Sequence, residues 1–282
     1  MTLDAAERRA LERLVDTALA EDLGPGDLTA GLVPAGAKMR AAVVVRDAAA
    51  VLCGAAWFDA VFGRLNPAIV VDWQVQDGAA LTAGQRVCTV EGPARDLLSG
   101  ERAALNLLQT LSGTATRTAR YVEAVAGTGT VILDTRKTIP GLRLAQKYAV
   151  RCGGGRNHRI GLFDAILIKE NHIRSAGSIE AALAAARATD PAIQVEIEVE
   201  TLVELSQALE AGASRVLLDN FDLGGLREAV RLAAGRADLE ASGGITLDRV
   251  RAIAETGVQF ISVGALTKHV AATDYSMLFE FD

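Results

Sequence analysis

Charged and amide side chains follow four short apolar segments in the C-terminal half of this 282-residue chain. The four groups are Asp134 with Arg136 and Lys137, Lys169 with Glu170 and Asn171, Glu198 with Glu200, and Asp219 with Asn220. Guanidinium and ammonium groups bind carboxylates and phosphates, whereas carboxylates are hard oxygen ligands. Glu198 and Asp219 therefore predict a Mg²⁺ site in which substrate phosphates supply most of the ligands. Ion pairing of these two carboxylates with Lys137 or Lys169 is the structural alternative.

A glycine-rich loop, CGGGRNHRIG, adds further groups that bind anions. Its Arg156, His158 and Arg159 suit planar carboxylates, which arginine binds through two parallel hydrogen bonds. Taken alone, His158 is more often structural than functional. The spacing of the three histidines, His158, His172 and His269, matches no metal-binding motif.

Small residues follow the last two apolar segments of the chain. Ser242, Gly243 and Gly244 come after the fifth segment, and Gly264 comes after the sixth. Because a helical pattern follows each of them, their backbone N–H groups could approach a phosphate closely. Tight turns between strand and helix are the alternative. Neither a G-x-G-x-x-G nor a Walker A motif is present, so dinucleotide or ATP binding by those routes has no support.

Short apolar segments and helical patterns alternate from about residue 128 onward. The predicted strands are 131–134, 165–169, 195–199, 215–219, 239–242 and 260–264, and the helical patterns cover 178–188, 201–212, 223–235 and 247–257. Alternation of this kind with short connections requires parallel strands. The sequence therefore predicts an incomplete α/β barrel. Its active site would lie at the carboxyl ends of the strands, where the polar residues named above would meet.

The first part of the chain lacks this alternation. Residues 27–95 contain strand and turn patterns that predict an α+β domain with an antiparallel sheet. The first 24 residues predict an amphipathic helix, and the helix-rich segment 97–126 would link the two parts. Within it, GERAALNLLQTLSG reads as a helix start. The segment DGAALTAGQ resembles half of a biotinyl or lipoyl domain, but the absence of a lysine at its turn argues against a carrier.

Composition narrows the classes of function. The formal net charge of -6 argues against nucleic-acid binding through phosphate contacts. The segment 134–174 nevertheless contains nine lysines and arginines and three acidic residues, which predicts a focused pocket for a small anion. Three cysteines without C-x-x-C spacing argue against a disulfide framework and favour a reducing cytoplasm. No apolar stretch predicts a signal peptide or a membrane span.

Several long motifs, in their order and spacing, resemble the quinolinate phosphoribosyltransferase family. They are EDLGPGDLT, EGPARDLLSGERAALNLLQTLSG, LDTRKTIPGLR, KYAVRCGGGRNHRIGLFDAILIKENHI, EIEVE, LLDNF, SGGI and ISVGALTKH. The resemblance implies an α+β domain at residues 1–112, with a C-terminal tail at 274–282 packed back on it, and an incomplete barrel at 113–273. It implies a pentosyltransferase of de novo NAD synthesis that converts quinolinate and phosphoribosyl pyrophosphate to nicotinate mononucleotide, pyrophosphate and CO₂.

The resemblance also implies roles for individual residues. The quinolinate-binding residues would be Arg102, Arg136, His158, Arg159 and Lys169, with Arg102 supplied by the neighbouring subunit of a homodimer. The phosphoribosyl pyrophosphate site would comprise Lys137, Glu198, Asp219, Ser242, Gly243, Gly244 and Gly264. Catalytic roles would fall to Lys137, Lys169, Glu198 and Asp219, the last two near a Mg²⁺ ion. No role is implied for Lys268 or His269.

Three alternatives stay open from the sequence. A related phosphoribosyltransferase would act on another ring carboxylate. A Schiff-base lyase or aldolase would use Lys169, which ends a predicted strand, to form an imine. A non-catalytic barrel would serve only as a scaffold. The set of Arg102, Arg136 and Arg159 favours the transferase, because neither a lyase nor a scaffold needs three guanidinium groups.

Overall fold

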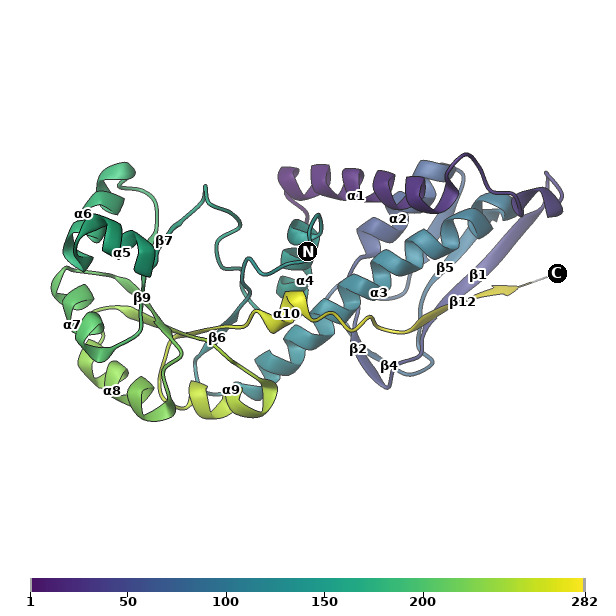
Figure 1. Ribbon diagram of the computed structural model, residues 1–282. Coiled ribbons are helices and arrows are strands. Elements are labelled where there is room, and N and C mark those ends of the chain that lie inside the picture. Colours follow the sequence, from purple (N-terminus) through teal and green to yellow (C-terminus); the bar gives the residue numbers. More distant parts are fainter. Residues whose placement is uncertain (1, 281–282) are drawn as a thin grey trace. The chain divides into compact units, whose positions relative to one another are not determined.

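The computed structural model describes residues 2–280, which form two compact units (Figure 1). Unit 1 comprises the described residues up to Ala119, the segment Ile139–Gly154 and the described residues from His269 onward. Unit 2 comprises Arg120–Thr138 and Gly155–Lys268. The chain therefore crosses between the units several times, and the boundary expected at residue 112 lies inside a helix of unit 1.

An antiparallel sheet is the centre of unit 1. Its strands lie in the order β12 (Tyr275–Glu280), β1 (Lys38–Val45), β5 (Arg86–Pro93) and β3 (Val70–Trp73), and β2 (Ala49–Val51) pairs with β4 (Ala80–Thr82). Every one of these pairs is antiparallel, so the prediction of an α+β domain with an antiparallel sheet is confirmed. The C-terminal strand β12 lies at an edge of the sheet, beside β1.

Helices complete unit 1. They are α1 (Ala5–Leu23), the short 3₁₀ helix Ala30–Leu32, α2 (Ala55–Leu65), α3 (Ala94–Ala124) and α4 (Arg143–Cys152). Helix α1 begins with a capping box, in which the Asp4 carboxylate accepts the N–H of Glu7 at 2.8 Å and the Glu7 carboxylate accepts the N–H of Asp4 at 3.0 Å. Its apolar face buries Leu11, Val15 and Leu19 in the core of unit 1, as an amphipathic helix requires.

Helix α3 begins at Ala94, directly after β5, so the prediction of a helix start at GERAALN is wrong. The two glycines of that motif lie inside the helix, where they allow close packing. A Cβ atom on Gly100 would lie 2.8 Å from a ring carbon of Phe62, and one on Gly113 would lie 2.1 Å from the carbonyl oxygen of Ala271. Although α3 has 31 residues, no helix in the described part of the chain is apolar enough over a sufficient length to cross a membrane.

Unit 2 is built on a six-stranded parallel sheet. The strand order is β6 (Val131–Leu133), β11 (Phe260–Ser262), β10 (Asp238–Ser242), β9 (Arg215–Asp219), β8 (Val195–Val199) and β7 (Ile166–Ile168). The connecting helices are α5 (Glu170–Ala176), α6 (Ile179–Thr189), α7 (Leu202–Glu210), α8 (Leu223–Ala233), α9 (Leu247–Ala254) and α10 (Ala265–Lys268). The sheet ends at β6 and β7, so the predicted incomplete barrel is confirmed.

The two faces of this sheet differ in composition. Helices α6 to α9 pack against one face (Figure 1), which buries apolar residues such as Ile197, Val199 and Val216. Side chains alternate between faces along a strand. The residues between these apolar ones, including Glu196 and Glu198, therefore point to the opposite, concave face of the sheet.

Candidate active site

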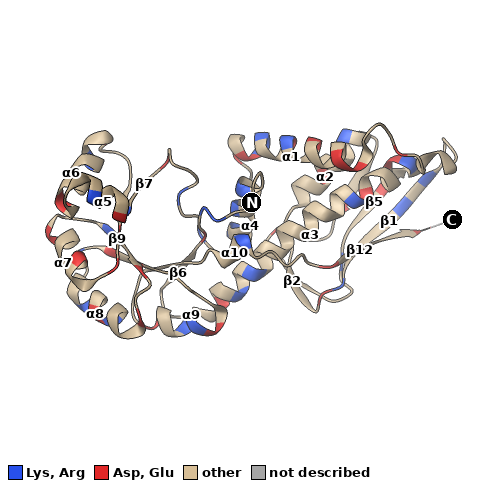
Figure 2. Cartoon of the chain, viewed as in Figure 1, with Lys and Arg blue, Asp and Glu red and all other residues tan. Residues whose placement is uncertain are grey.

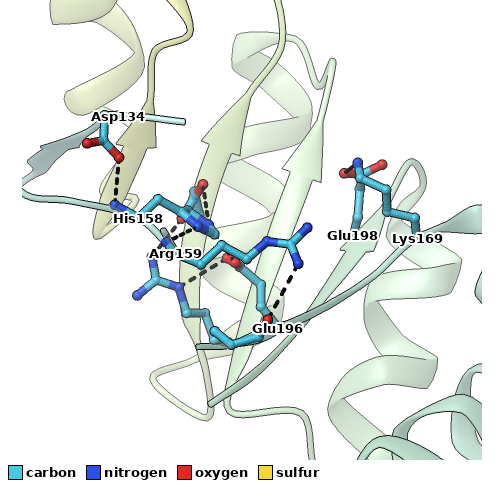
Figure 3. A network of polar contacts seen from close by, with 9 residues as sticks. Asp134, His158, Arg159, Lys169, Glu196 and Glu198 are labelled. Atoms are coloured by element: carbon cyan, nitrogen blue, oxygen red, sulfur yellow. Dashed lines mark hydrogen bonds and ion pairs between the residues drawn. The ribbon is translucent and has the colours of Figure 1, made fainter. Parts of the chain in front are cut away.

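The loop that carries His158 runs beside β6 and is anchored there. A parallel bridge joins Leu133 of β6 to Arg156. The carboxylate of Asp134, which is fully buried, accepts the backbone N–H of His158 at 2.9 Å (Figure 3). It also accepts the side-chain amide of Asn157 at 2.6 Å. The loop is thus fixed next to the residues that follow β6, and Asp134 has a structural function at this point.

A cavity of about 160 Å³ opens on the concave face of unit 2. Most of the predicted site residues of this unit line it: Arg136, Lys137, His158, Arg159, Lys169, Glu198 and Ser242. The remaining lining residues are Thr135, Leu167, Leu217, Glu240 and Ser262. The predicted Asp219, Gly243, Gly244 and Gly264 belong to unit 2 but do not line this cavity. Residues from all six strands of the sheet, or from the segments that follow them, thus meet at one place.

Two arginines lie close together at the cavity. The pKa of Arg159 is lowered, first by partial burial and then by the positive charge of Arg136. The Arg159 side chain also donates a hydrogen bond to the carbonyl oxygen of Ala165 at 3.4 Å. Figure 2 shows basic positions on this loop and acidic positions on the strands of unit 2. Two neighbouring guanidinium groups repel each other, so an anion between them would be stabilised.

Carboxylates and lysines form a second charged group. Lys169, which follows β7, forms an ion pair with Glu198 of β8. Burial and the charge of Glu198 raise the pKa of Asp219, and Lys169 and Lys137 act in the opposite direction. The expected alternative for Glu198, pairing with a lysine, is therefore present. Asp219 instead accepts the amide of Asn220 at 2.8 Å.

The small residues near the ends of β10 and β11 have different surroundings. Gly243 has a φ of +98°, and a Cβ atom there would lie 2.1 Å from the side-chain oxygen of Asn220. A Cβ atom on Gly264 would lie 3.0 Å from the side chain of Lys137. Gly244, with a φ of +58°, has open space around it. Gly264 therefore makes room for Lys137, whereas Gly244 leaves its backbone accessible.

A buried network beneath the cavity was not predicted. The Nε2 atom of His158 lies 2.8 Å from a carboxylate oxygen of Glu196 and 3.5 Å from one of Glu240. Arg215 binds the same two carboxylates at 3.0 Å and 2.6 Å. The signal for these residues was the two-residue period of the strands: Glu196 precedes Glu198 by two positions, and Glu240 precedes Ser242 by two.

Arg102 lies on α3 in unit 1, where its side chain is exposed. Among residues 2–280 its guanidinium has no hydrogen-bond or ion-pair partner. The structural alternative to a shared site is a surface ion pair of Arg102 with the nearby Asp96 or Glu101. Asp96 instead accepts the side-chain amide of Asn66 at 2.7 Å, and neither ion pair is formed within the described chain.

Comparisons with known proteins agree along the whole chain. Residues 27–112 match the sequence model described as the quinolinate phosphoribosyl transferase N-terminal domain, and residues 114–278 match that of the C-terminal domain. A nicotinate-nucleotide pyrophosphorylase [carboxylating] of Mycobacterium leprae (strain TN) is 43% identical over 283 residues, which cover 98% of this chain and 99% of that protein. A probable enzyme of the same name from Bacillus subtilis (strain 168) is 42% identical over 268 residues, 95% of this chain and 92% of that protein.

Solved structures show the same similarity. The nicotinate-nucleotide pyrophosphorylase from Francisella tularensis superposes with a TM-score of 0.94 at 48% identity and covers 96% of each chain. NadC from Streptococcus pyogenes superposes with a TM-score of 0.94 at 37% identity and covers 99% of each chain. Both units therefore have counterparts of known structure.

Proposed function

The chain belongs to the quinolinate phosphoribosyl transferase family, and we propose that it transfers a phosphoribosyl group to quinolinate and releases pyrophosphate and CO₂. The product would be nicotinate mononucleotide, a precursor in de novo NAD synthesis. The observation that supports this substrate is the proximity of Arg136 and Arg159 at the cavity. A pyridine with two adjacent carboxylates supplies the anionic groups that two guanidinium groups would bind.

The basic residues of the cavity would orient the substrate. With its carboxylates held by Arg136, Arg159 and Lys169, the ring nitrogen would face the anomeric carbon of the phosphoribosyl group. Orientation of this kind supplies a large part of a rate enhancement. The nitrogen lone pair forms the new bond to that carbon as pyrophosphate leaves. The ring nitrogen is then positively charged, and it stabilises the electron pair that stays on the adjacent ring carbon as CO₂ departs, after which that carbon takes a proton.

Glu198 and Asp219 would stabilise the positive charge that develops on the ribose as pyrophosphate leaves. The same two side chains fit a Mg²⁺ site. Both offer hard oxygen ligands. Burial and the charge of Glu198 raise the pKa of Asp219, and a divalent cation would relieve the repulsion between the two carboxylates. When bound, Mg²⁺ would neutralise charge on the pyrophosphate. Lys137, which lies against Gly264, would do the same from the protein.

The phosphate groups would lie near the ends of β10 and β11. The positive φ of Gly244 and the open space around it leave its backbone N–H accessible, which suits a close approach by a phosphate. Helix α9 begins three residues further on, at Leu247, so its N-terminus would favour the same negative charge. We assign Ser242, Gly243 and Gly244 to the phosphoribosyl pyrophosphate site on this basis.

A homodimer with shared active sites would explain the position of Arg102. Leu98, one turn before it on α3, lines a groove of about 700 Å³ on unit 1 together with Leu32 and Met39. Leu32 is 83% exposed, and exposed apolar surface of this kind is typical of a protein interface. Arg102 would then reach the quinolinate of the neighbouring subunit.

Because the cysteines form no disulfide within the described chain, a reducing cytoplasm suits the enzyme.

Mixed dimers would test Arg102. Inactive Arg102→Ala subunits and inactive Glu198→Gln subunits are combined under conditions in which subunits exchange. Random pairing makes half of the dimers mixed, and each mixed dimer has one site with both defects and one with neither, so about a quarter of wild-type activity returns. If mass spectrometry confirms exchange and no activity returns, Arg102 does not act in the partner's site.

Release of pyrophosphate and CO₂ tests the reaction itself. Purified protein is incubated with phosphoribosyl pyrophosphate and Mg²⁺, with and without quinolinate, and we expect both products only when quinolinate is present. Turnover of nicotinate without turnover of quinolinate would contradict the substrate assignment.

Omission of Mg²⁺ from the same assay tests the metal. Borohydride trapping with carbonyl substrates tests a lyase that uses Lys169, although the ion pair with Glu198 engages the ammonium form of that side chain.

A further inference from the structure

Both ring nitrogens of His158 already have hydrogen-bond partners inside the protein. The backbone N–H of Arg159 points at Nδ1 at 2.7 Å, and Nε2 lies 2.8 Å from a carboxylate oxygen of Glu196. A backbone N–H can only donate, so Nδ1 accepts and the ring hydrogen lies on Nε2. The ring therefore donates its hydrogen to Glu196 and has no second N–H to offer a substrate carboxylate.

We propose that His158 is a positioning residue that holds Arg159 in place, and that Glu196 and Arg215 fix His158 for this purpose. This inference rests on the proposed function, because it concerns how the quinolinate pocket is assembled. It differs from direct binding of quinolinate by the imidazole, which the family resemblance implies. The backbone N–H of Arg159 donates to Nδ1. The orientation of the imidazole therefore fixes the position of the Arg159 backbone, from which the guanidinium reaches the cavity.

The groups that hold the imidazole are buried and rigid. Only 4% of the Glu196 side chain and none of the Glu240 side chain is exposed. Arg215 bridges the two carboxylates, and its guanidinium lies 4.1 Å from the centre of the Phe260 ring. A planar guanidinium that binds two carboxylates and stacks on an aromatic ring has little freedom to rotate. Glu196 is thereby fixed as the acceptor for Nε2.

The location of the network agrees with a supporting role. His158 and Arg159 line the cavity of about 160 Å³ described above, and also a second cavity of about 230 Å³ that contains Glu196, Arg215 and Phe260. The network therefore forms the layer between the two cavities. Figure 3 shows His158 and Glu196 turned toward each other, with Lys169 and Glu198 apart from them. Support from a neighbouring layer is what holds a binding side chain in a productive position.

The position of the ring hydrogen is measurable in the wild-type protein. The chain has three histidines, so ¹⁵N-labelled protein gives a simple imidazole NMR spectrum, and a His158→Gln variant identifies the His158 signals. At mildly alkaline pH we expect a neutral ring with its hydrogen on Nε2, before and after quinolinate is added. A hydrogen on Nδ1, or loss of the Nε2 hydrogen bond to Glu196 when quinolinate binds, would overturn the proposal.

Kinetics of two variants at the same residue give a second test. Glu196→Leu removes the acceptor for Nε2, and we expect the KM for quinolinate to rise about tenfold or more, with the KM for phosphoribosyl pyrophosphate nearly unchanged. Glu196→Gln keeps a carbonyl oxygen as acceptor and should restore most of the loss. Glu255→Gln, which alters an exposed ion pair on unit 2, is the matched control and should change neither KM.

The outcomes separate this inference from the proposed function. Wild-type protein without quinolinate-dependent pyrophosphate release contradicts the proposed function, whereas the NMR experiment does not depend on turnover. Equal increases in both KM values for Glu196→Leu, or no rescue by Glu196→Gln, contradict the positioning role. If Glu196→Leu does not fold, the wild-type spectrum and the Glu196→Gln kinetics still decide between direct binding and positioning.

Discussion

The two sheets of this protein bury different chemistry. In unit 1, β1 and β5 bury apolar side chains, among them Val43, Val45 and Val90, in a core completed by aromatic residues of α2. In unit 2, the helix-covered face is equally apolar, but the concave face buries Glu196 and Glu240. The central strands of the unit 1 sheet thus bury mainly apolar side chains, whereas the unit 2 sheet has apolar side chains on one face and buried, paired charges on the other.

The difference separates stability from function. Apolar burial contributes roughly 25 cal/mol per Å², whereas buried ion pairs rarely stabilise a fold more than apolar side chains of the same volume would. Burial and the charge of Glu196 raise the pKa of Glu240, so the negative charge of this carboxylate is unfavourable there. The charged face is therefore best explained by its function in the active site. Substitutions in the core of unit 1 should change the free energy of unfolding, whereas substitutions at the site in unit 2 should change catalysis or substrate binding.

The largest effect is expected from the apolar core of unit 1. Phe58 is fully buried, and its ring lies 5.1 Å from that of Phe62 and 5.5 Å from that of Trp73. Phe58→Ala should lower the free energy of unfolding by about 3 to 5 kcal/mol, measured by urea denaturation, with the kinetic constants of the folded fraction unchanged. The exposed Val70 of the same sheet is the control, since Val70→Ala should have little effect on either quantity.

The carboxylates at the rim of unit 2 should show the opposite behaviour. We expect Asp219→Asn to lower kcat by about 100-fold or more while the melting temperature stays close to that of the wild type, because asparagine keeps an oxygen that can accept the amide of Asn220. Glu198→Gln should behave alike. Asp238, at the other end of the neighbouring strand and exposed, is the matched control: Asp238→Asn should keep full activity. A collapse of stability in Asp219→Asn without a specific loss of kcat would favour a structural role.

The arginines of the cavity should affect one substrate only. Arg136→Ala and Arg159→Ala each remove a charge-assisted contact to a carboxylate, worth roughly 1.5 to 3 kcal/mol. Titration calorimetry should therefore show weaker binding of quinolinate and nearly unchanged binding of phosphoribosyl pyrophosphate. Arg156 is exposed on the same loop and lines only the second cavity, not the cavity of about 160 Å³, so Arg156→Ala should leave both affinities unchanged. Equal losses of both ligands would contradict the assignment.

The sequence predicted most of the barrel because its signals are local. The strands at 195–199 and 215–219 have the predicted bounds, since apolar residues and helix-capping residues lie close together in the chain. The start of α3 was missed because Gly100 was taken as the beginning of a helix, and only its packing against Phe62 shows why a glycine is needed inside the helix. Contacts between distant segments cannot be seen in local patterns.

The site, too, has a part that the sequence predicted and a part that it did not. Polar residues at strand ends were predicted, because position alone brings them to one rim. The support formed by Glu196, Arg215 and Glu240 was missed, because none of these residues stands at the carboxyl end of its strand, where the site residues were sought. Their pairing with His158 depends on a loop that enters beside β6, and that path is fixed by the buried carboxylate of Asp134, which no sequence period indicates.

The smallest predicted effect concerns pH, and it depends on the groups that face His158. Burial has the largest influence and lowers the pKa of the imidazole, but the hydrogen bond to Glu196 and the charges of Glu240 and Glu196 outweigh it. Arg215 also acts to lower the pKa. The net result is a pKa above the ordinary value of 6.5, so the ring gains its second proton at a higher pH than a free imidazole does.

Stability and quinolinate binding should therefore change in opposite directions as the pH rises. The folded state favours the protonated ring, so the contribution of His158 to stability is complete below about 6.5 and is lost as the pH rises through the pKa in the folded protein. Over the same range the KM for quinolinate should fall, because loss of the proton on Nδ1 restores an acceptor for the N–H of Arg159. Melting temperatures and KM values between about pH 6 and 9 measure both trends, and His158→Gln should remove both slopes. A KM that rises with pH in the wild-type protein would show that the protonated imidazole is the form that binds substrate, and would assign His158 to direct contact with the carboxylate.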